Sequence, residues 1–302
     1  MNDKQRLSLT ASEVCGIVVT YNPDREFPKR LDRLAKQVDC TVVVDNHSSD
    51  TCLGMLKKTS AELGTCLIRN EDNLGIATAL NQGVKFARDR GYKWAITLDQ
   101  DTVPCEEMLE IVINAYEGCR FREHVGIVGS NYYDQNSGRS PIDKKEHSNC
   151  DWLEMRDVIT SGSLMSISVY QSIGAFRDDF FIDYVDVEYC LRLKNNGYRV
   201  IIATRPGMIH GIGNTSVRKF LGRKVSIYNH SPVRSYYGAR NQLFVVRQYF
   251  WDDPYWGLST SISPIINCLK AMLFEKDKML KVKYSALGVY DALHSRGGRL
   301  PQ

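Results

Sequence analysis

The stretch WAITLDQDT, residues 94 to 102, places two acidic residues directly after an apolar run. Trp94 to Leu98 is short and β-branched, which predicts a buried strand. Asp99 and Asp101 follow it with one residue, Gln100, between them. Two carboxylates at this spacing can converge on one hard cation, and Mg²⁺ and Mn²⁺ prefer oxygen ligands. A turn that uses Asp for its backbone hydrogen bonds is the alternative interpretation.

Strands and helices alternate on both sides of this stretch. Strands are expected at residues 14–20, 41–44, 66–68, 94–98 and 125–128, and helices at 27–38, 50–63 with Asp50 as N-cap, 73–87 with Asn73 as N-cap, and after Pro104. This order predicts an α/β fold with right-handed βαβ units, a mostly parallel, Rossmann-like sheet and helices on both of its faces. In such sheets ligands bind at the carboxyl ends of the strands.

Polar side chains follow three of these strands. They are Tyr21 and Asn22, Asp45 and Asn46, and Asp99 to Asp101. A carboxylate at Asp45 can accept a hydrogen bond from a pyrimidine N3–H, or it can simply be solvated or cap a turn. Free N–H groups at the helix that begins near Asn73 and Gly75 favour an anion such as a diphosphate, with ordinary capping as the alternative. Arg69, after the third strand, faces either that diphosphate or solvent.

Several function classes are disfavoured by what the sequence lacks. No G-x-G-x-x-G follows the first strand and no G-x-x-x-x-G-K-[ST] occurs, which argues against a nicotinamide dehydrogenase and a P-loop NTPase. The net charge of +4 is too small to indicate nucleic-acid binding. D-x-D-T also opens the aspartyl-phosphatase pattern, in which Asp99 is a phosphoryl nucleophile. That pattern normally lies on the first strand, and here it ends the fourth.

A second acidic cluster lies in FIDYVDVEYCLRLKNNGYRV, residues 181–200. Asp183 and Asp186 are three residues apart and can share one side of a helix start. One of them can act as a general base, or both can simply favour the helix dipole. Glu188 and Arg192 are spaced to pair along a helix. His210, after a further expected strand, is either structural or a ligand to a metal or phosphate.

Charge is distributed unevenly along the chain. From Ser216 to Gln302 there are 14 Lys and Arg against 5 Asp and Glu, so the first 215 residues carry a net charge of −5. The basic part is expected to be helical and is rich in aromatic residues. It contains no apolar run of the roughly 20 residues that span a membrane. The nine cysteines form no C-x-x-C pair, and the polar N-terminus has no signal-peptide core, which predicts a cytoplasmic protein.

Taken in order, the segments VVTYNP, VVVDNHSSD, NEDNLGIATALNQG, ITLDQDT, FIDYVDVEYCLRLKNNGYRV and IHGIG resemble the family 2 glycosyltransferases with the GT-A fold. The resemblance runs from about residue 14 to 250 and is strongest to bacterial rhamnosyltransferases. It implies inverting transfer of a sugar from a nucleotide donor, dTDP-L-rhamnose or a UDP-sugar, to a hydroxyl. A non-enzymatic sugar-nucleotide-binding scaffold is a further alternative.

The resemblance also implies roles for individual residues. Asp186 aligns with the catalytic base, although Val185 replaces a common Glu and Asp183 is a second candidate. Asp99, Asp101 and His210 are expected to hold Mg²⁺ or Mn²⁺. The expected donor-binding residues are Thr20, Tyr21, Asn22, Asp45, Asn46, Arg69, Asn73, Gly75, Asp99 and Gln100. Glu188 and the pair Arg240-Asn241 are expected on the acceptor side or at the start of the C-terminal helical region.

The expected organisation is a GT-A catalytic domain over residues 1–230 and a helical region over residues 231–302. Within the first, residues 14–130 form the nucleotide-sugar half and residues 131–230 the acceptor half. Family context suggests a polyprenyl-diphosphate-linked glycan acceptor in surface polysaccharide synthesis. The basic, aromatic tail is then expected to lie peripherally on the inner face of the cytoplasmic membrane. A helical cap on the sheet and a homodimer contact are the alternatives for this region.

Overall fold

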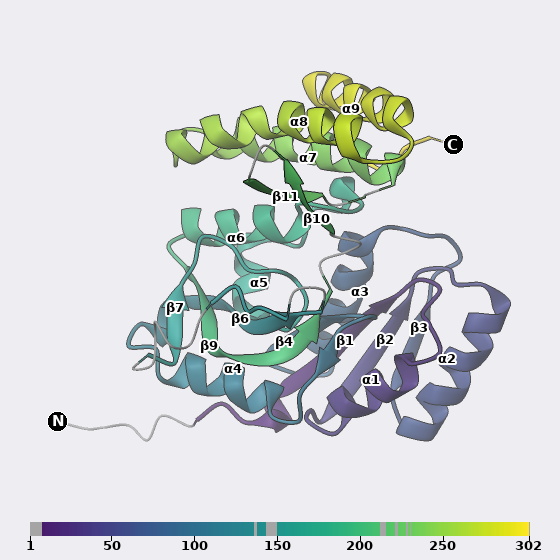
Figure 1. The fold of residues 1–302 in the computed structure, drawn as a ribbon. Coiled ribbons are helices and arrows are strands. Elements are labelled where there is room, and N and C mark those ends of the chain that lie inside the picture. Colours follow the sequence, from purple (N-terminus) through teal and green to yellow (C-terminus); the bar gives the residue numbers. More distant parts are fainter. Residues whose placement is uncertain are drawn as a thin grey trace. The chain divides into compact units, whose positions relative to one another are not determined.

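The computed structural model describes residues 8–135, 138–142, 150–211, 216–220, 223–227, 229 and 231–301. By packing, the chain divides into two compact units (Figure 1). The first comprises residues 1–74, 78–176 and 190–210, and the second comprises residues 75–77, 177–189 and 211–302. This division concerns packing only, and the functional halves expected from the sequence stay a prediction.

A nine-stranded sheet forms the centre of the first unit, with the order β3-β2-β1-β4-β8-β6-β9-β5 and with β7 paired to β9. The strands are β1 (Val14–Thr20), β2 (Cys40–Asp45), β3 (Cys66–Arg69), β4 (Trp94–Asp99), β5 (Val103–Pro104), β6 (Val125–Asp134), β7 (Trp152–Glu154), β8 (Ser163–Ser166) and β9 (Arg199–His210). The five strands expected before residue 130 all form, and β6 and β9 run further than their apolar cores indicate.

Strands β1 to β4 pair in parallel, which confirms the α/β expectation for the first hundred residues. Beyond β4 the pairing becomes mixed, because β8 lies between β4 and β6 and is antiparallel to both. Strand β9 is again parallel to β6, so β1, β2, β4, β6 and β9 all end at the same edge. The polar residues that follow these strands therefore gather at one edge of the sheet.

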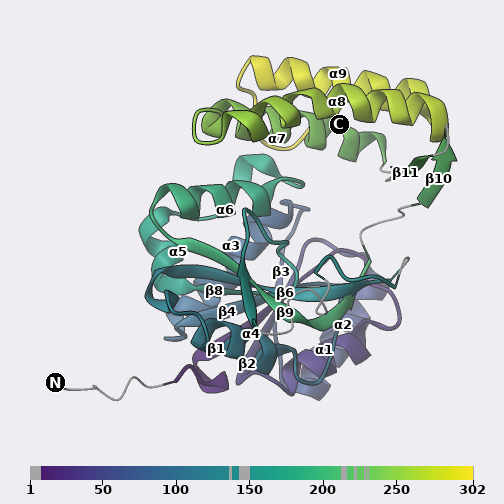
Figure 2. The same ribbon diagram turned by 60° about the vertical axis from the view of Figure 1, so that its left-hand side comes forward.

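Helices cover both faces of this sheet (Figures 1 and 2). The helices of this unit are α1 (Phe27–Ala35), α2 (Asp50–Leu63), α3 (Ile76–Asp89), α4 (Met108–Glu117), α5 (Ile167–Ile173) and the end of α6 (Val185–Asn195). Leu34 of α1 and Val112 of α4 share one core with Val14 and Val18 of β1. On the opposite face Gly83 of α3 packs so closely on Ile17 that a Cβ there would lie 2.3 Å from it.

Three helix starts and ends differ from the sequence expectation. Helix α1 ends at Ala35 rather than near Val38, and the N-cap of α2 is Ser49 rather than Asp50. Helix α3 begins at Ile76, three residues after Asn73, so the expected capping by Asn73 is wrong. Gly75, with φ of +86°, turns the chain into the helix instead, in a backbone region that favours glycine.

The second unit is mainly helical. It contains the 3₁₀ turn η3 (Asp178–Phe180), the first turn of α6, the hairpin β10 (Ser216–Phe220) and β11 (Arg223–Ile227), and the helices α7 (Pro232–Tyr249), α8 (Pro254–Phe274) and α9 (Lys278–Leu293). Ser231 and Asp253 cap α7 and α8 with their side chains. The helical C-terminal region expected from the sequence is thus present. Among the described residues, no helix combines the length and hydrophobicity needed to cross a membrane.

Candidate functional site

Asp99, Asp101 and His210 form a compact group of possible metal ligands at the carboxyl edge of the sheet. One donor atom of each lies within 4.8 Å of the others. Asp99 ends β4 and His210 ends β9, while Asp101 lies in the exposed turn between β4 and β5. The His210 Nε2 atom is 4.0 Å from Asp99 Oδ2. Two carboxylates and one imidazole suit Mn²⁺ or Mg²⁺, so the residues present fit the divalent cation that the resemblance implies.

Tertiary pairing brings His210 to this group from 109 residues away in the chain. Val103 of β5 pairs with Ile209 of β9, which carries Thr102 to the His210 ring. The Thr102 hydroxyl lies 2.8 Å from His210 Nδ1 and 2.6 Å from the Ser161 hydroxyl. Ser161 Oγ in turn accepts the backbone N–H of Asp99 at 3.0 Å. With Nδ1 engaged by Thr102, it is Nε2 that faces the carboxylates.

Replacing Thr102 with Val, which keeps the shape and removes the hydroxyl, is expected to weaken Mn²⁺ binding by about 10- to 100-fold. The reason is that the His210 ring loses the hydrogen bond that orients it. Titration calorimetry on the protein without donor measures this directly. Thr41→Val is the matched control, because the buried Thr41 hydroxyl has no hydrogen-bond partner among the described residues. Equal Mn²⁺ affinity in both variants would contradict the expectation.

Asp45 lies fully buried at the end of β2. Its Oδ1 accepts hydrogen bonds from the hydroxyls of Thr20, at 3.1 Å, and Ser48. Its Oδ2 accepts the backbone N–H of Ser48 at 3.1 Å. A carboxylate has about four acceptor positions. These three bonds join the ends of β1 and β2.

The residue pair Tyr21 and Gln100 links the ends of β1 and β4. The Tyr21 N–H donates to Gln100 Oε1 at 2.7 Å, and Gln100 Nε2 donates back to the Tyr21 carbonyl at 3.2 Å. The Tyr21 side chain is about half exposed. Next to it, the Asn22 N–H donates to Ser48 Oγ at 2.8 Å. The expected donor-binding residues at the ends of β1, β2 and β4 are thus joined by hydrogen bonds along one edge of the sheet.

Asn46 extends this edge toward the segment before α3. Its Nδ2 donates to Asn73 Oδ1 at 3.0 Å, and its Oδ1 accepts from the Leu74 N–H at 2.9 Å and from Asn70 Nδ2 at 3.1 Å. Arg69, which precedes Asn70 in the chain, is exposed and lies beside Asp45 in the β2–β3 register. The side chain expected to cap α3 instead positions the loop that follows β3.

Gly75 belongs to the second unit, and its surroundings are closed. The first N–H of α3, at Ile76, donates to the Phe181 carbonyl at 2.7 Å. A Cβ on Gly75 would lie 2.5 Å from that same oxygen. The helix start that was expected to receive a diphosphate therefore already has one of its N–H groups bound by the chain.

Asp183 and Asp186, the two candidates for the base, differ in their surroundings. Asp183 has a φ of +66° and forms an ion pair with Arg234, whose Nη2 and Nε both donate to it. Asp186 lies half-buried in the first turn of α6, and its Oδ1 accepts the Val187 N–H at 2.9 Å. The Asp183 carboxylate is thus engaged by a cationic side chain, whereas Asp186 accepts a backbone N–H of its own helix.

Glu188, Arg240 and Asn241 are buried rather than exposed to a ligand. Each is at most 1% exposed. Glu188 Oε1 accepts the Tyr249 hydroxyl at 2.9 Å. Arg192, the expected helical partner of Glu188, donates to the carbonyls of Ile173 at 3.0 Å and Ala175 at 2.8 Å. These contacts indicate that the buried side chains help to hold the second acidic cluster, Asp183 and Asp186, in place.

The sequence did not single out four polar residues that the structure places at these edges, namely Ser48, Asn70, Thr102 and Ser161. A signal existed for two of them. Thr102 belongs to the D-x-D-T segment, and Ser161 precedes Gly162, which has a φ of +74°. Ser48 and Asn70 lie in ordinary polar loops, and only their hydrogen bonds to Asp45 and Asn46 distinguish them.

Comparison with known sequences gives two matches of different extent. Residues 15–174 match the profile of glycosyl transferase family 2. The chain is also 32% identical over 249 residues to the dTDP-rhamnosyl transferase RfbF of Shigella flexneri, an alignment that covers 78% of this chain and 81% of that protein. The profile match includes both the Asp45 edge and the Asp99–Asp101 turn.

Two solved structures share this fold at low sequence identity. The mannosyltransferase PcManGT from Pyrobaculum calidifontis, in complex with GDP-Man and Mn²⁺, has a TM-score of 0.56 at 16% identity, covering 94% of this chain and 88% of that one. TarS residues 1–349 from S. aureus, in complex with UDP-GlcNAc, has a TM-score of 0.57 at 15% identity, covering 94% and 81%. At this identity the likeness concerns the fold, and it confirms the GT-A architecture.

Proposed function

The chain belongs to glycosyl transferase family 2, and from this premise we propose that it transfers L-rhamnose from dTDP-L-rhamnose, with inversion, to a hydroxyl of a lipid-linked glycan in bacterial surface polysaccharide synthesis. The observation that carries the choice of donor is the 32% identity to a dTDP-rhamnosyl transferase over 78% of the chain. Family membership sets aside the phosphatase and scaffold alternatives. A UDP-sugar donor is the remaining alternative, supported by the fold shared with a structure that binds UDP-GlcNAc.

We assign the donor to the carboxyl edge formed by β1, β2 and β4. In this assignment the buried Asp45 holds the ends of β1 and β2 at the base, and the half-exposed Tyr21 ring lies beside a pyrimidine base. Thymine and uracil are both pyrimidines, so the assignment fits either donor class. Asn46 and Gln100 position the loops around the nucleotide, and Arg69 and Asn73 are assigned to its diphosphate.

Asp99, Asp101 and His210 are the proposed ligands of the divalent cation. When bound, the cation supplies positive charge against the diphosphate that leaves as the glycosidic bond breaks. Thr102 and Ser161 hold the ligands in register through the chain of hydrogen bonds described above. Removal of the metal with a chelator should therefore stop transfer without unfolding the sheet, because the three ligands lie at its surface edge.

Asp186 is the proposed general base. It takes the proton from the acceptor hydroxyl, which then attacks the anomeric carbon from the side opposite the leaving diphosphate and inverts the configuration. No covalent intermediate with the protein is needed. The start of α6 supports this role, because Asp186 lies half-buried in its first turn, while Asp183 forms an ion pair with Arg234.

Thermal stabilisation by sugar nucleotides tests the donor proposal. At equal concentration with Mn²⁺, dTDP and dTDP-L-rhamnose are expected to raise the melting temperature more than GDP or GDP-mannose, because the chain is 32% identical to a dTDP-rhamnosyl transferase. A tenfold affinity difference corresponds to about 1.4 kcal/mol of stabilisation at saturation. UDP compounds are the decisive comparison. If UDP-sugars stabilise the protein and dTDP compounds do not, the rhamnosyl proposal is wrong.

Helix α8 supports the proposed position on the inner face of the cytoplasmic membrane. Its exposed large side chains recur at intervals of three and four residues, namely Tyr255, Leu258, Ile262, Ile265, Leu269 and Met272. A helix of 21 residues is about 32 Å long and 10 Å wide, so two copies pairing along it would bury only roughly 600 Å². A stable dimer buries about 1,200 Å² or more, which favours a lipid surface over a second copy.

The membrane proposal predicts binding to vesicles that contain anionic lipid. Exposed Lys276, Lys278 and Lys283 are near α8 in the chain and supply the positive charge. Cosedimentation should fall as salt is raised from about 0.1 M to 1 M, because the Debye length shrinks from about 10 to 3 Å. Ile265→Glu should weaken binding while leaving the melting temperature unchanged, since this side chain is exposed. The membrane proposal would be contradicted if the wild type and the Ile265→Glu variant bound the vesicles equally at low and high salt, or if neither bound them.

A further inference from the structure

The segment that leads into Asp186 follows a strained backbone path. The Ile182 N–H donates to the Phe180 carbonyl at 2.7 Å, and Phe181 between them has φ of 62° and ψ of −61°. These values define the rarer of the two γ-turns, which side chains other than glycine seldom adopt. Asp183 and Tyr184 then have φ of 66° and 63°. Such a run of non-glycine residues persists only where the surroundings hold it in place.

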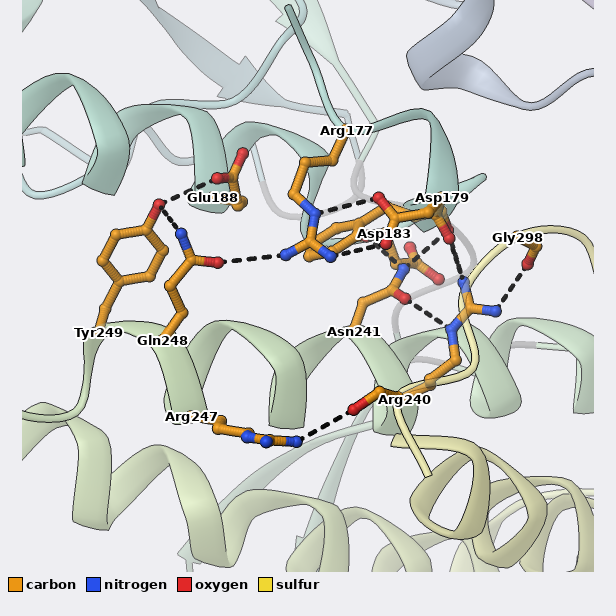
Figure 3. A network of polar contacts seen from close by, with 12 residues as sticks. Arg177, Asp179, Asp183, Glu188, Arg240, Asn241, Arg247, Gln248, Tyr249 and Gly298 are labelled. Carbon is orange, nitrogen blue, oxygen red and sulfur yellow. Dashed lines mark hydrogen bonds and ion pairs between the residues drawn. The ribbon is translucent and has the colours of Figure 1, made fainter. Parts of the chain in front are cut away.

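Two residues of α7 supply that hold (Figure 3). Arg240 Nη2 donates to the carbonyls of Asp179 at 2.8 Å and Phe180 at 3.1 Å. Asn241 Nδ2 lies 2.8 Å from the carbonyls of Phe180 and Ile182 and 2.9 Å from that of Asp183. Arg240 Nε donates to Asn241 Oδ1 at 2.9 Å, which fixes the amide with its nitrogen toward the segment. Both side chains are fully buried.

The C-terminal segment closes the same network. Arg240 Nη1 donates to the Gly298 carbonyl at 2.6 Å, and the Gly298 N–H donates to the Asp179 carbonyl at 2.6 Å. The Leu300 N–H donates to the Tyr237 hydroxyl at 2.8 Å. Residues near the end of the chain are therefore bonded both to the strained segment and to the arginine that holds it.

The other side of the segment is open. Asp183, Tyr184 and Val187 line a cavity of about 580 Å³ whose remaining wall comes from α7, α8 and α9. The hydrogen bonds from Arg240 and Asn241 to its carbonyls oppose relaxation of the γ-turn. The Ile76 N–H on the Phe181 carbonyl and the Arg234–Asp183 ion pair add to this restraint.

We propose that Arg240, Asn241 and the Gly298 backbone are positioning residues that hold residues 179–184 in a strained path and thereby set the position of Asp186. This inference rests on the proposed role of Asp186 as the base. It predicts that loosening the network lowers the rate of transfer while leaving the donor site, which is built on the sheet of the first unit, unaffected.

Asn241→Asp is the sharpest test, because it keeps the shape and replaces the donating nitrogen with an oxygen that repels three carbonyls. We expect kcat to fall by about 100-fold, as for a misplacement of about 1 Å, with the donor KM unchanged. Amide hydrogen exchange at Ile182 to Val185 should accelerate. Asn131→Asp is the matched control, since the buried Asn131 amide also bonds carbonyls, at Ile142 and Thr204, far from this segment in the chain.

Gly298→Pro gives a second, milder variant should Asn241→Asp fail to fold. Proline lacks the N–H that bonds Asp179 and cannot adopt the φ of +86° at this position. Unchanged kcat and unchanged exchange in either folded variant, or an equal loss of kcat in Asn131→Asp, would overturn the inference. If the wild-type protein transfers no sugar, the proposed function is at fault, whereas the exchange comparison still decides whether the network holds the segment.

Discussion

Replacing Asp186 with Asn is expected to lower kcat for sugar transfer by about 10²- to 10⁴-fold, the range that general-base catalysis contributes. The amide has the size of the carboxylate and cannot accept the proton of the acceptor hydroxyl. Donor affinity should stay within about threefold, because the proposed donor residues lie on the ends of β1, β2 and β4. Steady-state kinetics together with calorimetric titration of donor separates the two quantities.

Asp183→Asn is the comparison that decides which carboxylate is the base. Asp183 is held in an ion pair with Arg234, so we expect a smaller loss of kcat and a lower melting temperature from the broken ion pair. The Arg234 side chain is already half-exposed to water in the pair, so the loss of stability on removing the Asp183 charge is limited. Should Asp183→Asn abolish transfer while Asp186→Asn retains it, the assignment of the base must be reversed.

Replacing Asp99 or Asp101 with Asn is expected to lower metal-dependent transfer by about 10²- to 10³-fold, because charge stabilisation by a bound cation is worth several kcal/mol. Each substitution removes one negative charge from the three-residue group of possible ligands. Mn²⁺ binding by calorimetry and kcat as a function of Mn²⁺ concentration measure the effect. A partial recovery at high Mn²⁺ is expected for Asp101, which is the more exposed of the two.

Asp32→Asn is the surface control for these variants, because Asp32 forms a surface ion pair with Lys36, one turn further along α1. It should leave Mn²⁺ binding and kcat unchanged. If Asp99→Asn keeps full activity in the presence of a chelator, the protein transfers sugar without a divalent cation and the metal assignment falls. Hydrolysis of simple phosphate monoesters that depends on Asp99 would instead support the phosphatase alternative.

The N-terminal half of the sheet and its acidic turn follow from local sequence. Val14 to Thr20 and Trp94 to Leu98 are short apolar runs that cannot remain in water, and the polar residues after them mark where each strand ends. Parallel strands joined by helices end at one edge, so Asp45 and Asp99 were placed together by the order of elements alone. The family assignment made from these ordered segments is confirmed by the profile match and the rhamnosyl transferase relative.

Contacts between residues distant in the chain could not be predicted from local sequence. The insertion of β8 between β4 and β6, the Thr102–His210 contact, and the burial of Arg240 and Asn241 each depend on segments about 40 or more residues apart. No periodicity records such a pairing, because it is set by which buried faces and hydrogen-bonding groups fit together once the chain is compact. A strained turn is likewise invisible in the sequence FFIDY, which contains no glycine to signal a positive φ.

By itself, then, the sequence determined the five strands before residue 130, the helices between them to within a few residues, the acidic turn after β4 and the family to which the chain belongs. These depend on apolar spacing and on residue types that act within a few positions of one another. Only the tertiary structure decided that Asp183 forms an ion pair with Arg234, that Thr102 contacts His210, and that Gly298 supports the segment before the proposed base. Each of these depends on a buried polar group finding its partner across the fold, and an unpaired buried polar group is too costly to leave unmatched.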